Sequence, residues 1–168
     1  MLLTEDTFCK IIQDTWSSIL GLLVDFPAGP TTASAENFKV QVNVSGAWNG
    51  EVRLSCPPNL ARLVAAAFFQ VDAEQSGRDQ IVDALSEIVH IIGGNLKSLL
   101  PQPVTLSLPS VHNSDDSSED AVESERIWSI VLASRGYPFQ VSLFGKASSG
   151  TLPQPEEIQP LRENSLQS

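Results

Sequence analysis

Residues 79–100 have the sequence Asp-Gln-Ile-Val-Asp-Ala-Leu-Ser-Glu-Ile-Val-His-Ile-Ile-Gly-Gly-Asn-Leu-Lys-Ser-Leu-Leu, and this stretch decides the fold. Apolar residues recur every three or four positions, as they do along one face of an α-helix. At roughly 100° per residue counted from Asp83, Glu87 falls at about 40°, His90 at about 340° and Gly94 at about 20°. The apolar side chains lie opposite and are Ile81, Val82, Leu85, Ile88, Val89, Ile92, Leu96, Leu99 and Leu100. We therefore predict one long helix with a broad buried face and a narrow exposed stripe.

The stripe has the composition of a docking surface: a carboxylate, an imidazole and a bare glycine backbone. Each glycine inside a helix costs roughly 1 kcal/mol relative to alanine, and its missing side chain lets another chain come close. We predict that Asp83, Glu87 and Gly94 contact a partner, and that Glu87 and His90 carry any chemistry. Three alternatives stay open: a solvated Glu87, His90 as a polar surface residue, and Gly93-Gly94 as a site of close packing within the fold.

Composition and charge restrict the class of protein. The chain has 168 residues, of which 42% are hydrophobic, and this suits one compact domain. No apolar run is long enough for a membrane helix, and the acidic N-terminus is unlike a secretory signal. Cys9 and Cys56 lack metal-ligand spacing, and we expect both to be reduced thiols. Together these features predict a cytoplasmic protein without membrane association. The formal net charge of −10 argues against a nucleic-acid partner.

Local composition divides the chain into a domain, loops and a tail. The segment 113–125 is rich in acids and nearly free of apolar residues, so we predict a flexible loop within a domain covering 1–146. The Gly/Pro/Thr/Ser/Ala-rich stretch 27–35 is a second loose connection. Residues 147–168 are polar and interrupted by prolines, and we interpret them as a flexible C-terminal tail.

The remaining pattern predicts an α+β domain. Helical periodicity begins near Thr4 or Asp6, and Asn49-Gly50 predicts a tight turn between two strands. Besides the long helix we expect helices over 4–23 and 59–69 and strands over 38–44, 51–56, 104–108, 127–133 and 139–144. The strands follow one another in hairpins, so the sheet should be mostly antiparallel, with a long central helix and two further helices.

The order of these elements, the hairpin Gly46-Ala-Trp-Asn-Gly-Glu-Val and the spacing Asp83-x3-Glu87-x2-His90 resemble the CheX/CheC/FliY family of chemotaxis phosphatases. That family's motif has Asp or Ser, three residues, Glu, two residues and Asn, followed by a small, glycine-containing sequence. Ile91-Ile-Gly-Gly-Asn95 is similar to the latter. The resemblance covers roughly residues 4–146, and the single motif is similar to the CheX branch.

The resemblance implies an activity within two-component chemotaxis signalling. The helix would enter the active site of a phosphorylated CheY-like receiver domain and promote hydrolysis of its aspartyl phosphate. Glu87 would contact a receiver lysine, the residue at position 90 would align the attacking water, and the receiver would supply Mg²⁺. This protein would need no cofactor or metal of its own.

His90 stands where the family has asparagine. Neutral imidazole also offers one donor and one acceptor, so His90 could orient water in a pH-sensitive way. The alternative is a catalytically impaired module that still binds a receiver or another signalling protein. A structural homodimer, paired through exposed strand edges, is a further alternative. A metal site formed by Glu87, His90 and His112 has too few well-placed ligands to be favoured.

Overall fold

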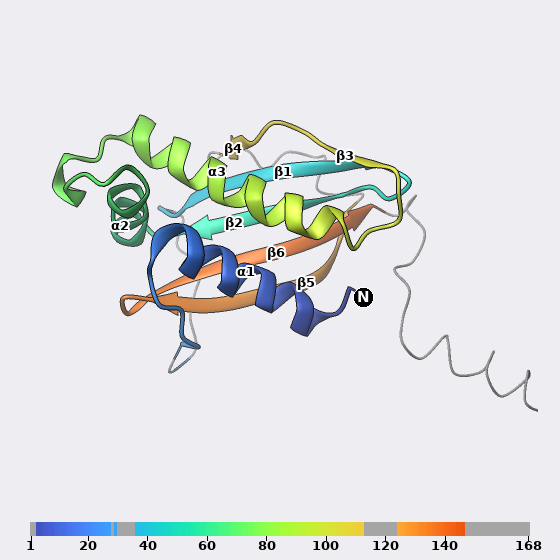
Figure 1. Ribbon diagram of the computed structural model, residues 1–168, viewed down its shortest axis with the longest axis horizontal. Helices are drawn as coiled ribbons and strands as arrows, with labels where there is room; N and C mark the ends of the chain where they lie inside the picture. The colour runs from blue at the N-terminus through green and yellow to red at the C-terminus, as the bar shows by residue number, and fades with distance from the viewer. Residues whose placement is uncertain (1–2, 28, 30–35, 113–123, 147–168) are drawn as a thin grey trace, which may run out of the picture.

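The computed structural model describes residues 3–27, 29, 36–112 and 124–146, and these form an α+β fold with helices on one face of a sheet (Figure 1). The helices are α1 (Glu5–Leu20), α2 (Pro58–Phe69) and α3 (Arg78–Lys97), with a short 3₁₀ helix, η1 (Ala73–Gln75), before α3. α1 and α3 lie side by side across the sheet, and α2 packs at the end where α3 begins. The predicted fold class is confirmed. None of the helices in the described ranges is long and apolar enough to cross a membrane.

The sheet has six strands, and every pairing is antiparallel. They are β1 (Phe38–Gly46), β2 (Gly50–Cys56), β3 (Val104–Leu106), β4 (Ser110–His112), β5 (Ser124–Ser134) and β6 (Tyr137–Lys146). The order is β3-β1-β2-β6-β5, and β4 pairs with the same edge of β1 as β3. The strand β4 was not predicted, because three residues are too few to show an alternating pattern.

The core lies between the sheet and the helices. Alternate residues of β2 are buried, which is the pattern of a strand with one covered face. Against this face α1 packs Trp16, whose ring stacks on Phe139 of β6 at 4.0 Å between centroids. α1 begins at the cap Thr4, whose hydroxyl accepts a hydrogen bond from the Thr7 amide at 3.1 Å, and ends at Gly21 with φ of 67°.

The long helix is confirmed, although it ends at Lys97 rather than at residue 100. The amides of Leu99 and Leu100 bond to carbonyls three residues back, at 2.9 and 3.2 Å, so the chain tightens beyond Lys97. The side-chain Nε2 of Gln102 then donates a hydrogen bond to the Leu100 carbonyl at 2.9 Å. Leu100 remains buried in this turn, as the apolar pattern predicted.

The connection between β1 and β2 corrects one prediction. Gly50 is already paired with Val44, so Asn49-Gly50 does not form a two-residue hairpin turn. The loop is longer because the ring of Trp48 folds back into the core, over Gly50, where a side chain would collide with it. The Asn49 side chain closes the loop through hydrogen bonds with the Gly46 amide and carbonyl, both at 3.3 Å.

The hairpin between β5 and β6 is confirmed. Ser134 pairs with Tyr137, which leaves Arg135 and Gly136 as the turn, with φ of 55° and 83°. Two positive φ values are the geometry of a type I′ turn. The acidic segment 113–125, apart from 124–125 in β5, and the tail 147–168 lie outside the described residues, as does most of the stretch 27–35.

Candidate functional site

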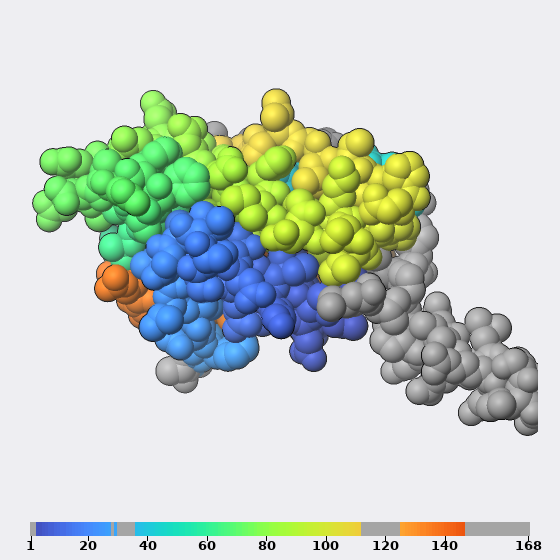
Figure 2. Space-filling model, viewed as in Figure 1, coloured from blue at the N-terminus to red at the C-terminus, as the bar shows by residue number. Residues whose placement is uncertain are grey.

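The exposed stripe of α3 is the candidate site. Asp83, Glu87, His90 and Gly94 are all exposed, as predicted from their angles round the helix. Figure 2 shows the outer surface of α3 on the same face of the molecule as α1. The predicted site residues are therefore brought together on one accessible surface.

The other side of α3 holds this surface in place. Leu85, Ile88, Ile92 and Leu96 are fully buried, as predicted. Burial of each such side chain contributes roughly 1.5–3 kcal/mol before the loss of conformational entropy. The helix contacts β1 and both other helices, so the exposed side chains project from a rigid backbone.

The two adjacent glycines have different surroundings. Gly93 is buried, and a Cβ built on it would lie 3.0 Å from Val42 Cγ2 and 3.5 Å from Leu106 Cδ1. Gly94 is exposed, and a Cβ there would meet no atom within 4 Å. Close packing within the fold therefore explains Gly93. At Gly94 the absence of a side chain leaves the backbone accessible beside His90.

Negative charge gathers on the first half of the stripe. Asp79, Asp83 and Glu87 follow one another at four-residue intervals and all are exposed. Like charges at this spacing destabilise a helix by roughly 0.2–0.5 kcal/mol per pair, although Asp79 in the first turn also interacts favourably with the helix dipole. Among the described residues, the side chains of Glu87 and His90 have no hydrogen-bonding or ion-pair partner. Both remain available to an incoming molecule.

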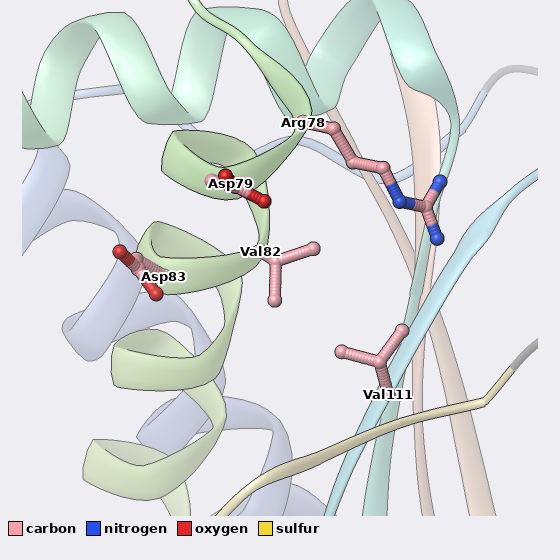
Figure 3. A pocket seen from close by; sticks show the side chains of 5 residues that line it. All are labelled: Arg78, Asp79, Val82, Asp83 and Val111. Carbon is pink, nitrogen blue, oxygen red and sulfur yellow. The ribbon is translucent and has the colours of Figure 1, made fainter.

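A groove lies beside the first two turns of α3 (Figure 3). Val82 of α3 and Val111 of β4 face each other across it, and Asp79, Asp83 and Arg78 complete its lining. Val111 lies opposite the buried Val40 in the register, so it points to the helix side of the sheet. The Arg78 guanidinium lies over the Phe38 ring at 5.6 Å. The groove has a volume of about 510 Å³.

The described part of the chain gives little support for a metal site or for a reactive cysteine. It contains no group of three His, Cys, Asp or Glu side chains placed to share a metal ion. Burial raises the pKa of the Cys56 thiol, and burial together with Asp6 and Glu5 raises that of Cys9. Because a thiol must ionise to act as a nucleophile, neither cysteine is poised to react.

Sequence reasoning missed the groove residues Arg78, Asp79, Val82 and Val111. Val82 was assigned to the buried face, but it is only half-buried because β4 stands at a distance from the helix there. Asp79 could have been found from the sequence, since it precedes Asp83 by one helical turn on the same face. Nothing in the sequence pointed to Val111, because β4 was not predicted.

Fold and site together define an α+β protein in which one long helix packs on an antiparallel sheet and presents an exposed polar stripe. Residues 38–132 match the family model described as chemotaxis phosphatase CheX. The match covers more than half of the chain, and the protein belongs to the CheX family. No curated protein sequence matches the chain significantly.

Solved structures show the same fold at low sequence identity. The chemotaxis protein CheX from Vibrio vulnificus is 13% identical, with a TM-score of 0.65 over 83% of this chain and 95% of that one. A chain of the CheX-CheY-BeF3-Mg²⁺ complex from Borrelia burgdorferi is 14% identical, with a TM-score of 0.65 over 87% of this chain and 100% of that one. FliY from Thermotoga maritima is 18% identical, with a TM-score of 0.52 over 88% and 93%.

Proposed function

We propose that this protein binds the phosphorylated receiver domain of a CheY-like response regulator and promotes hydrolysis of its aspartyl phosphate. The observation that carries the proposal is the exposed pair Glu87 and His90, three residues apart on a rigid helix and without a described partner. Family membership and a neighbour solved as a complex with CheY support the choice of receiver.

The proposed step is an in-line displacement at phosphorus. The oxygen of water forms a bond to phosphorus while the bond from phosphorus to the aspartyl oxygen breaks, giving inorganic phosphate and a free carboxylate. Phosphoryl transfer needs positioning and neutralisation of charge more than covalent help, and Mg²⁺ on the receiver would supply part of the latter. This protein would therefore contribute one oriented water.

Glu87 and His90 would divide the work. The Glu87 carboxylate would form a charge-assisted contact with a receiver lysine and fix the helix in the receiver's active site. A neutral His90 ring would accept a hydrogen bond from the attacking water and hold it in line. Asp83 and Gly94 flank this pair on the same exposed stripe, where they would contact the surface of the receiver.

The test of the proposal is phosphate release from a phosphorylated CheY-like receiver, with and without the protein. Glu87→Ala should weaken receiver binding about 10- to 100-fold, because a hydrogen bond to a charged group contributes roughly 1.5–3 kcal/mol. Stability should change by less than about 0.5 kcal/mol, since Glu87 is exposed. Asp14→Ala, which removes an exposed carboxylate from α1, is the matched control and should leave binding unchanged. Equal binding by wild type and Glu87→Ala would refute the role of α3.

The impaired binding module is the second candidate, favoured by one observation: His90 is larger than the asparagine of the family motif. The variant His90→Asn separates the two. If wild type accelerates phosphate release and His90→Ala does not, the protein is a phosphatase. If only His90→Asn accelerates it while wild type binds, the protein is a binding module.

A further inference from the structure

We infer that the groove between α3 and β4 is a second contact site for the receiver and selects receivers that present a lysine or arginine next to an aliphatic side chain. The inference rests on the proposed function and adds the chemistry of the partner. The groove is lined by Arg78, Asp79, Val82, Asp83 and Val111.

The shape and lining of the groove fit an aliphatic side chain. Val82 and Val111 face each other from two different elements and are both only half-buried (Figure 3). Two half-buried apolar walls leave surface that a partner's aliphatic group can remove from water. The groove is open rather than enclosed, which suits a side chain on the surface of a protein better than a small molecule.

The charge at the rim fits a cation. Asp79 and Asp83 lie on consecutive turns of α3, both contribute to the lining of the groove, and both are exposed. The Arg78 guanidinium lies over Phe38, at the opposite side of the lining from these carboxylates. A basic side chain seated in the groove would lie beside these two carboxylates, and complementary charge of this kind determines which partner binds and how quickly.

The groove adjoins the exposed stripe of α3, so one receiver can contact both. Asp83 belongs both to the groove and to the stripe that carries Glu87, so a receiver seated on Glu87 also reaches the groove. One helical turn separates Asp79 from Asp83 and another separates Asp83 from Glu87, each about 6 Å along the axis. A single partner surface can cover that span.

The experiment measures affinity for CheY-like receivers of the same organism in their BeF3/Mg²⁺ form, at low and moderate salt. Asp79→Asn and Gln80→Lys change the net charge equally and lie on the same turn, but Gln80 does not line the groove. We expect Asp79→Asn to weaken binding at least about fivefold and to flatten its salt dependence, and Gln80→Lys to weaken it less than about twofold. Val82→Thr, which keeps the shape of the side chain, should weaken binding at least about threefold.

Partner residues are identified by replacing basic residues around the receiver's active site with glutamate. One of these receiver variants should restore the binding that the Asp79→Lys variant has lost. This result would identify the receiver residue that pairs with Asp79. If Asp79→Asn and Val82→Thr both bind like wild type while Glu87→Ala does not, the groove is no contact site and the proposed function stands. If wild type binds no receiver, the inference and the proposed function fail together.

Discussion

Replacing Gly94 by alanine should stabilise the fold and weaken docking at the same time. Gly94 is exposed within α3, and a Cβ there meets no atom within 4 Å. Alanine at such a position is better than glycine by roughly 0.5–1 kcal/mol, chiefly because the unfolded chain loses freedom. In a domain of this size that gain corresponds to a rise in melting temperature of about 1–4 °C.

Gly93→Ala is the matched comparison, because it brings the same gain in helix propensity. Here the new Cβ would lie 3.0 Å from Val42 Cγ2 on β1, closer than ordinary van der Waals contact. Overpacking of this kind costs roughly 1–3 kcal/mol. The two variants should therefore differ in stability by about 1–3 kcal/mol, with Gly93→Ala the less stable.

Urea unfolding of both variants measures this difference, and receiver binding by Gly94→Ala measures the effect on docking. The packing argument would be refuted by equal midpoints for the two variants, or by a lower midpoint for Gly94→Ala than for wild type. If Gly94→Ala is more stable and binds a receiver normally, Gly94 lies outside the interface.

Three further predictions concern other parts of the molecule. If His90 aligns water, His90→Ala should slow phosphate release while receiver binding survives, because the ring that would hold the water is removed; an unchanged rate would contradict it. Because burial raises the pKa of the Cys56 thiol, this thiol should react slowly with Ellman's reagent at pH 8 until the protein is unfolded, and thermal stability should fall above about pH 8.5 as the thiol ionises in the unfolded chain. Rapid modification of Cys56 in the native protein would contradict this burial. Arg135→Asn should raise thermal stability by about 0.5 kcal/mol, because asparagine tolerates a positive φ better than arginine; a lower melting temperature would argue against the turn.

The fold could be predicted from the sequence where apolar residues recur with a regular, uninterrupted spacing along one element. The apolar face of α3 is long enough that both its burial and its exposed stripe could be predicted, and the strands predicted over 38–44 and 51–56 lie within β1 and β2. The turn at Asn49-Gly50 was wrong because the burial of Trp48 outweighs the local turn preference. The groove could not be predicted, since it depends on where the three-residue strand β4 stands relative to α3.

The glycine pair shows the same limit at the level of single residues. From sequence, Gly93 and Gly94 were one feature with two interpretations. The structure assigns close packing to Gly93 alone, because Gly94 lies about 100° further round the helix, on its exposed side.

The separation of buried and exposed residues on α3 has a consequence for how such a protein can change over generations. Asp83, Glu87 and His90 are exposed, whereas the side chains that anchor the helix are buried, so substitutions at these three positions should be nearly neutral for folding. A lineage could exchange asparagine for histidine at position 90 and acquire a new pH response, or lose catalysis, without a compensating change in the core. Specificity and stability would then be free to drift separately along one helix.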